Sequence, residues 1–171
     1  MEFTLERTIE VLSATPTVIN SLLGDLSPEW ITAGTPESWG PVEIIGHLIH
    51  CEEADWMPRA RLILEHGESK PFEPLDRFAQ FANDGKAVDE LIVAFAAARR
   101  ENLEVLQNMG LSDRVLDTAG THPDLGRVTL RQLLATWAVH DLTHIRQLAT
   151  VIAKRYDQQV GPWKEYLSIL K

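Results

Sequence analysis

Apolar residues recur along four long stretches of the chain at alternating steps of three and four, the spacing of an amphipathic helix. The first stretch covers about the first 25 residues. Pro16 lies inside it, so we expect a kink or a restart near Thr15, whose hydroxyl could cap the second half. The second stretch runs from Pro41, a residue favoured at the first helical position, to about His66, and it should bend at Pro58.

The third stretch begins near Ala87 and ends at Gly110, a residue type that commonly terminates helices. The fourth begins after Thr129, which forms a capping-box pattern with Gln132, and continues to about Tyr156. No convincing alternation typical of a strand competes with these four patterns. The sequence therefore predicts an all-α protein, a four-helix bundle formed by a single domain that spans residues 1–171.

Three connections separate the predicted helices, over residues 27–40, 68–86 and 111–128. The second connection is long enough for a functional lid or a partner surface, and four apolar side chains suggest that it packs onto the bundle. These side chains are Phe72, Leu75, Phe78 and Phe81. The third connection is rich in turn residues and is expected to hold a short extended pair. Near the end of the chain, the segment WKEYLSIL predicts a short helix tucked against the bundle.

Composition narrows the choice of partners and of compartment. The net charge of −9 argues against nonspecific binding to nucleic acid or to an anionic membrane, both of which need clustered Lys and Arg. The N-terminus lacks the basic start of a signal peptide, and no apolar run approaches the ~18 residues that span a bilayer. We therefore expect a cytoplasmic protein with a small-molecule substrate. Cys51, the single cysteine, is expected to be a small core residue.

The fourth helix carries ionisable side chains on its apolar face. His140, Asp141 and His144 fall on the same face as a set of large apolar residues. This set comprises Leu130, Leu133, Leu134, Trp137, Leu148, Val151 and Ile152. Burying three such groups alone costs several kcal/mol, so they must be paired or must bind a ligand. Histidines at positions i and i+4 lie one turn apart, which is the spacing that two metal ligands need.

The second helix offers a third histidine. His47 borders the apolar arc of that helix, whereas His50 lies roughly 60° further out, so the geometry favours His47 as an inward-facing ligand. Three imidazoles leave a coordination position open, as in catalytic metal sites. Zinc and nickel both suit a histidine site.

Several alternatives stay open at this point. The histidines could be ordinary core residues that are satisfied by hydrogen bonds. The segment HDLTH also resembles the HExxH motif of zinc metalloproteases, although an all-helical chain without an edge strand for substrate argues against that class. Asp141 could orient a ligand histidine, act as a catalytic base, or pair structurally with an arginine.

Two segments resemble the DinB-like family, also called the DinB/YfiT-like metalloenzymes. They are SWGPVEIIGHLIHCEEADW and, about 90 residues later, LLATWAVHDLTHIRQLATVIAKRY, which is followed by PWKEYL. The resemblance covers most of the chain and is most specific at the HL of the second helix and at the HxxxH of the fourth with its following Gln. It implies an up-down-down-up four-helix bundle, often a homodimer, with zinc or nickel bound by His47, His140 and His144.

The resemblance supports the prediction of a metal site more strongly than it supports any particular reaction. Some relatives are thiol-dependent transferases, so the leading hypothesis is a metal-dependent S-transferase. It would transfer a low-molecular-weight thiol, of the bacillithiol or mycothiol type, to a small electrophile. The alternatives are a metal-dependent hydrolase and a non-catalytic, stress-related bundle that binds a metal or another ligand. Asp141 is the candidate catalytic residue. Val139 and Leu142 face away from the main apolar stripe, which predicts a homodimer surface there.

Overall fold

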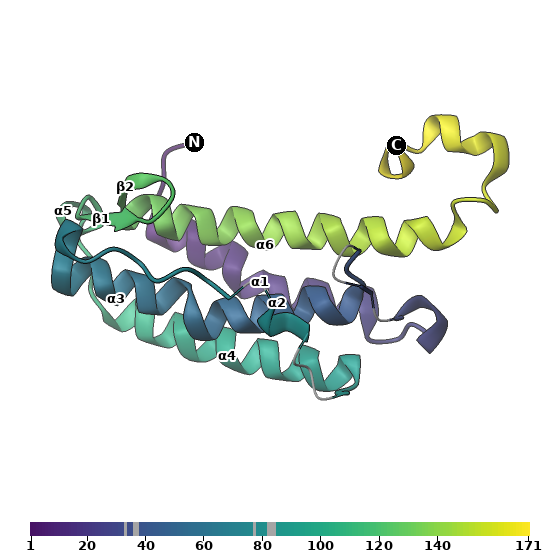
Figure 1. Cartoon of the computed structure of the whole chain (residues 1–171), viewed down its shortest axis with the longest axis horizontal. Helices are drawn as coiled ribbons and strands as arrows, with labels where there is room; N and C mark the ends of the chain where they lie inside the picture. The colour runs from purple at the N-terminus through teal and green to yellow at the C-terminus, as the bar shows by residue number, and fades with distance from the viewer. Residues whose placement is uncertain (33, 36–37, 77, 82–84) are drawn as a thin grey trace.

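The chain forms four long helical units, as its apolar spacing predicts. In the computed structural model they are α1 (Leu5–Leu23), the pair α2 (Pro41–Ala54) and α3 (Trp56–His66), α4 (Val88–Asn108), and α6 (Leu130–Ala153). The structure describes residues 1–32, 34–35, 38–76, 78–81 and 85–171, so parts of the first two predicted connections lie outside it. The prediction of a mostly helical four-helix bundle is confirmed (Figure 1).

The helices run in two directions. Figure 1 shows α1 and α6 running one way along the bundle, and the α2–α3 pair and α4 running the other way. Helix α1 packs against α6, and α2 packs against α4. Two consecutive units that point the same way need a connection as long as the bundle itself, and residues 67–87 provide it. This is the up-down-down-up arrangement, and its crossover passes over the outer side of α2 and α3.

Helix α1 passes through Pro16 without the restart expected at Thr15. The Thr15 hydroxyl does not cap a second helix. It donates to the carbonyl of Val11 at 3.1 Å. Pro16 has no N–H to donate to the carbonyl of Leu12, and a buried carbonyl without a donor costs about 1–3 kcal/mol. The guanidinium of Arg99, on α4, fills that role with a 2.9 Å hydrogen bond from Nη1.

The second unit breaks where Pro58 predicts a bend. Proline clashes with the carbonyl four residues before it, so the distortion appears one turn earlier. The helix axis breaks at Asp55, whose φ of −108° and ψ of −78° separate α2 from α3. The side chain of Asp55 pairs with Arg59, with 2.9 Å between Oδ1 and Nε. The break turns Asp55 toward the side of the bundle on which the crossover lies.

The remaining elements are short. Within the described part of the chain they are α5 (Asp113–Leu116), the antiparallel hairpin of β1 (Ala119–His122) and β2 (Gly126–Thr129), and six 3₁₀ turns. The hairpin confirms the extended pair expected within residues 111–128. The turns are Pro28–Trp30, Gly67–Ser69, Ala79–Phe81, Lys154–Tyr156, Gly161–Tyr166 and Ser168–Leu170. No helix among the described residues has both the length and the apolar character that a membrane crossing requires.

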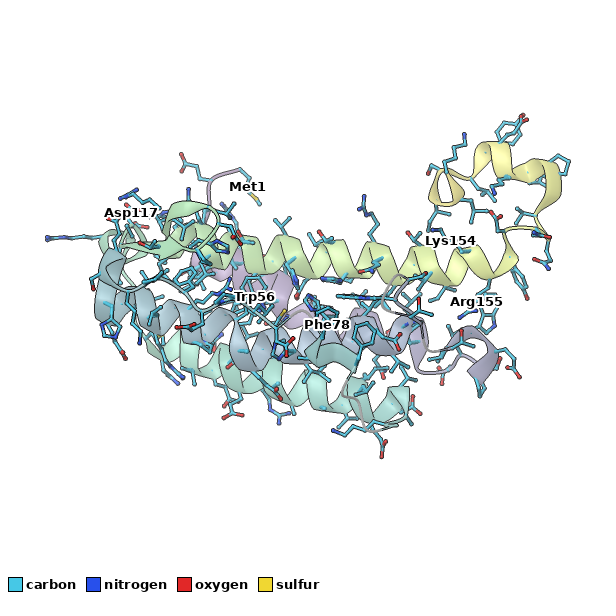
Figure 2. All side chains as sticks on the ribbon, in the orientation of Figure 1. Met1, Trp56, Phe78, Asp117, Lys154 and Arg155 are labelled. Carbon is cyan, nitrogen blue, oxygen red and sulfur yellow. The ribbon has the colours of Figure 1, made fainter. Side chains whose placement is uncertain are left out.

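One expectation about packing is confirmed except at Phe78, and the other is corrected. In the crossover Phe72 is buried and Leu75 and Phe81 are partly buried. Phe78, which Figure 2 labels, is 70 % exposed. The C-terminal segment forms two 3₁₀ turns, Gly161–Tyr166 and Ser168–Leu170, in place of the single short helix expected there. Of its apolar side chains only Leu170 is buried, whereas Trp163 and Tyr166 point into solvent.

The core consists of two apolar clusters, one toward each end of the bundle. The first contains Trp56 and Trp137, and the second contains Ile44 and Leu148. Each large side chain that is removed from water stabilises the fold by roughly 1.5–3 kcal/mol. His47 and His140 lie where these clusters meet, so the histidines are held by apolar packing on both sides.

Candidate metal centre

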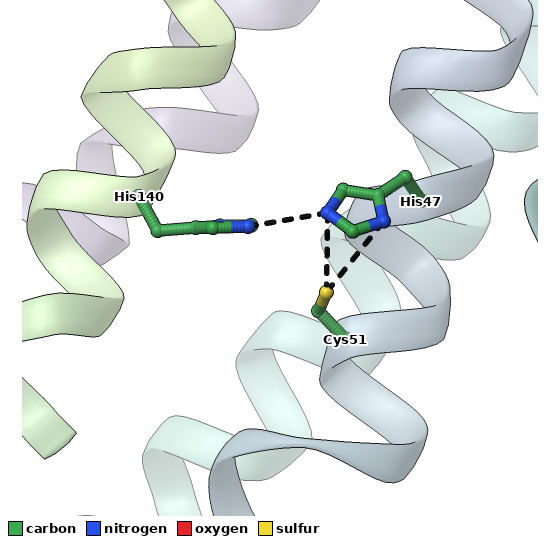
Figure 3. Close-up of side chains that lie close together, drawn as sticks. All are labelled: His47, Cys51 and His140. Carbon is green, nitrogen blue, oxygen red and sulfur yellow. Dashed lines mark hydrogen bonds between the residues drawn. The ribbon is translucent and has the colours of Figure 1, made fainter. Parts of the chain in front are cut away.

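The imidazoles of His47, His140 and His144 converge between α2 and α6. The Nε2 atom of His140 lies 3.2 Å from Nε2 of His47 and 3.1 Å from Nε2 of His144. Figure 3 shows His47 and His140 facing each other across the space between their helices. His140 and His144 are one turn apart on α6, as the i, i+4 spacing predicts. Packing of α2 against α6 brings the third imidazole to the same point.

All three imidazoles are neutral at physiological pH. Burial, with a contribution from the neighbouring His144, lowers the pKa of His47 from 6.5 to about 4. The same causes lower the pKa of His140 to about 3, and burial also lowers the pKa of His144. Neutral imidazole is the form that binds a metal ion, because the coordinating nitrogen must offer its lone pair.

Gln147 fixes the tautomer of His144. Its Oε1 atom lies 2.8 Å from Nδ1 of His144, and because an amide oxygen only accepts, Nδ1 carries the hydrogen. In neutral imidazole the other nitrogen is then free of hydrogen, so Nε2 of His144 offers a lone pair on the side that faces His140. An acceptor behind a ligating histidine is a regular feature of metal sites.

His140 is held by two stacked indoles. The rings of Trp56 and Trp137 stack with centroids 5.8 Å apart, and the Trp56 ring meets the imidazole of His140 edge-on at 5.0 Å. Nδ1 of His140 is buried and has no hydrogen-bond partner among the described residues. The orientation of this imidazole therefore depends on ring packing, whereas His144 depends on Gln147.

Cys51 lies closer to the histidines than its expected role as a plain core residue implies. Its Sγ atom is 3.5 Å from Nε2 of His47, one turn earlier on α2 (Figure 3). Donor atoms of His47, Cys51 and His140 all lie within 4.8 Å of one another, so these three residues form a candidate metal site. Burial and the neighbouring acids Asp55 and Glu52 raise the pKa of the thiol well above its usual range. The free thiol therefore stays protonated.

The spacing of the donors fits a divalent ion. Two nitrogens that bind one ion at about 2.1 Å lie about 3.0–3.4 Å apart for bond angles between a right angle and the tetrahedral angle. The two measured Nε2–Nε2 distances, 3.2 and 3.1 Å, fall in this interval. A thiolate and an imidazole on one tetrahedral ion lie about 3.6 Å apart. The Cys51–His47 distance of 3.5 Å is close to that value as well.

Asp141 belongs to a different set of contacts. Both of its carboxylate oxygens accept hydrogen bonds from Arg99, at 2.5 and 3.0 Å, and the residue is fully buried. These are the contacts of the structural pairing with an arginine that the sequence left open. No hydrogen bond between Asp141 and a histidine occurs among the described residues. Its assignment as the catalytic residue stays a prediction that the structure does not test.

A cavity of about 470 Å³ adjoins His47 on the crossover side. His47 forms part of its wall, together with Trp39, Leu75 and the ion pair of Asp55 and Arg59. The wall also includes Pro74, His122, Pro123 and Asp124. The residues of this wall come from α2 and α3, from the loop before α2, from the crossover and from the β1–β2 turn. The long crossover therefore closes one side of this cavity, through Pro74 and Leu75.

Glu43 holds the loop that carries Trp39. Its carboxylate Oε2 accepts from the backbone N–H of Gly34 at 2.7 Å and of Gly40 at 2.9 Å. Gly34 packs against the backbone of Ser38 and Gly40 so closely that a Cβ atom would clash. Trp39 is thereby placed over His47, with 5.2 Å between the ring centroids.

The remaining histidines lie outside this cluster. His66 sits at the end of α3 with its side chain exposed to solvent. His50 lies one turn beyond His47 on α2 and has no contact with the three imidazoles among the described hydrogen bonds. His122 lines the cavity, where its Nδ1 accepts from the backbone N–H groups of Asp124 and Leu125.

The sequence analysis did not predict a role for Arg99, although its position in the apolar pattern of α4 could have indicated one. Ile92, Phe95, Arg99, Leu103 and Leu106 follow the three- and four-residue steps of the apolar face of α4. An arginine within such a stripe must find acid partners, and Arg99 is only 1 % exposed. Glu52, on α2, is one of those partners.

Comparison with known proteins adds a family and a fold. Residues 12–148 match the sequence model of the DinB superfamily. No curated protein matches the chain. A solved structure of YfiT from Bacillus subtilis superposes with a TM-score of 0.74 at 17 % sequence identity and covers 90 % of each chain. That protein is described as a probable metal-dependent hydrolase with an unusual four-helix bundle topology.

Proposed function

Because the chain belongs to the DinB superfamily, we propose that it is a metal-dependent hydrolase of a small molecule, with a divalent ion held by His47, His140 and His144. The observation that carries the proposal is the convergence of three neutral imidazoles beside an accessible cavity. The description of YfiT as a probable hydrolase supports hydrolysis over the transferase reaction that we expected first.

The three histidines suit a catalytic centre better than a closed structural one. Structural zinc sites are usually completed by four protein ligands and are rich in cysteine, whereas catalytic sites keep a position open. Bound at the imidazoles, zinc or nickel supplies Lewis acidity, which polarises a carbonyl or phosphoryl oxygen and lowers the pKa of water. Gln147 would keep the lone pair of His144 Nε2 available to such an ion, and Trp56 would keep His140 in place.

The cavity supports a small-molecule substrate. A volume of about 470 Å³ accommodates a small molecule and is too small for a folded protein or a nucleic-acid strand. Its apolar side, formed by Trp39, Pro74 and Leu75, excludes water from one flank of the substrate. The ion pair of Asp55 and Arg59 provides polar groups at another part of the wall, where the substrate can be oriented.

The decisive experiment combines metal analysis with a paired assay. Untagged protein, purified without nickel and then loaded with zinc or nickel, is assayed with small p-nitrophenyl esters and p-nitroanilides. Hydrolysis that disappears with a chelator and in a His47→Ala variant supports the proposal. His66→Ala is the matched control, because that histidine is partly exposed at the end of α3 and should leave both metal content and activity unchanged.

The same metal-loaded protein tests the alternative hypothesis of an S-transferase. Bacillithiol, mycothiol and glutathione are each supplied as co-substrate with a chlorinated aromatic acceptor. Metal-dependent turnover with a thiol, in the absence of hydrolysis, would move the assignment to the S-transferase. Stoichiometric metal with neither activity would leave the non-catalytic, metal-binding bundle.

A further inference from the structure

The guanidinium of Arg99 joins four helices at the level of the histidine cluster. From α4, its Nε and Nη2 donate to Oε1 of Glu52 on α2 at 3.0 and 2.7 Å. Its Nη1 and Nη2 donate to the two carboxylate oxygens of Asp141 on α6. Nη1 also donates to the Leu12 carbonyl of α1, which Pro16 leaves without a helical donor. The planar fork of arginine can make this set of contacts, whereas lysine offers a single ammonium group.

The two acids that Arg99 holds are neighbours of the candidate donors in sequence. Glu52 directly follows Cys51 and lies five residues after His47 on α2. Asp141 directly follows His140 on α6. Trp137, one turn before His140, adds a 3.1 Å hydrogen bond from its indole N–H to Oε1 of Glu52. A shift of either helix along its axis would therefore break bonds to Arg99 and separate the imidazoles at the same time.

The network also leaves charge near the imidazoles. Glu52 and Asp141 together carry two negative charges and Arg99 carries one positive charge, so the formal sum is −1. All three side chains are at most 1 % exposed, where charges are weakly screened. Asn102 donates to the remaining oxygen of Glu52 at 3.0 Å and is uncharged. A residual negative charge beside three neutral imidazoles favours a cation over an empty site.

We propose that Arg99 is a positioning residue for the metal centre, because its bonds to Glu52 and Asp141 set the spacing between His47 and His140. The inference rests on the proposed function only in its metal site and does not depend on the reaction. Under this inference Asp141 positions His140 by binding Arg99, and it does not transfer protons at the reacting atoms. It also gives the buried network of Arg99, Glu52 and Asp141 a role beyond stability, since apolar replacements of buried ion pairs are often as stable.

The test is metal affinity measured by chelator competition on folded protein. Arg99→Met should weaken zinc binding by about 10–100-fold, the usual effect of losing a residue that orients metal ligands. Arg99→Lys should not restore the affinity, because one ammonium cannot bridge both acids. Either single variant leaves a buried carboxylate unpaired and can fail to fold. A triple variant, Arg99→Met with Glu52→Gln and Asp141→Asn, removes all three charges together. This variant keeps the experiment decisive, because its buried side chains carry no unpaired charge.

A second core variant separates positioning from general stability. Leu106→Ala opens a cavity in the cluster that includes Trp137 and removes no hydrogen-bond partner of Glu52 or Asp141. It should lower the melting temperature and leave zinc affinity unchanged. Cobalt-substituted protein supplies a further readout, since the visible spectrum of the triple variant should show altered coordination geometry. Wild-type affinity in the folded triple variant would overturn the inference, whereas absence of zinc binding by the wild-type protein would overturn the proposed function instead.

Discussion

Oε1 of Gln147 lies 2.8 Å from Nδ1 of His144 and so fixes which nitrogen of that imidazole faces His140. This relationship predicts that Gln147 controls metal affinity without touching the ion. Gln147→Leu should weaken zinc binding by about 10–100-fold, because Nδ1 loses its acceptor and the imidazole can rotate or change tautomer. Gln147→Glu keeps an oxygen at the same position and should stay near the wild-type affinity. Competition titration with a chromophoric chelator measures both, and equal affinities in all three proteins would contradict the prediction.

Loss of a single ligand histidine should nearly abolish the site. His144→Ala and His140→Ala each leave two imidazoles, and we expect affinity for zinc to fall by more than about 100-fold, a larger loss than that of a supporting residue. Elemental analysis of untagged protein after dialysis provides the measurement. Metal content that is unchanged in both variants would show that the convergence of these imidazoles does not create a metal site.

Cys51 offers a sharp test of the donor set. If the three imidazoles hold the ion by themselves, Cys51→Ala should change zinc affinity by less than about threefold, and the wild-type cobalt form should lack a thiolate-to-cobalt charge-transfer band. The variant should lose about 1 kcal/mol of stability or more, because it leaves a small cavity in a buried position. A strong charge-transfer band that vanishes in Cys51→Ala would place the sulfur among the ligands.

The metal-free protein should lose stability on mild acidification. Folding lowers the pKa of His47 from 6.5 to about 4 and that of His140 to about 3, so the unfolded chain binds more protons between these values. Stability from these groups is therefore complete above pH 6.5 and falls as the pH drops through 6 and 5. Urea unfolding of chelator-treated protein across this range gives the slope. A His47→Ala/His140→Ala variant should show a flatter dependence, and a slope equal to that of the wild type would exclude these histidines as its cause.

The outer face of α6 predicts self-association. Val139 is 62 % exposed and Leu142 is 52 % exposed, on the side of α6 that faces away from the core. We expect the wild-type protein to sediment as a dimer at micromolar concentration and the double variant Val139→Asp with Leu142→Asp to sediment as a monomer. Val93→Asp, on an equally exposed position of α4, serves as the control and should remain dimeric. A monomeric wild-type protein would remove the proposed interface.

The sequence alone was sufficient for most of the helical architecture. The apolar spacing located the long helices, the Thr129 and Gln132 pattern located the start of α6, and Pro58 predicted the break before α3. These features depend on residues within one or two turns of one another, where the backbone dictates which side chains share a face. The i, i+4 pair of His140 and His144 is of the same kind, and so was readable before any tertiary structure.

Contacts between helices were decided only by the tertiary structure. A helical wheel places His140 and Asp141 on the same inward arc, but it does not say that one faces His47 and the other Arg99. The position of Cys51 beside His47, the pairing of Glu52 and the cavity wall formed by the crossover are likewise absent from local periodicity. The physical reason is that periodicity fixes the direction of a side chain from its own helix axis. The rotation and the axial offset of one helix against another arise from packing of whole surfaces, to which residues far apart in the sequence contribute together.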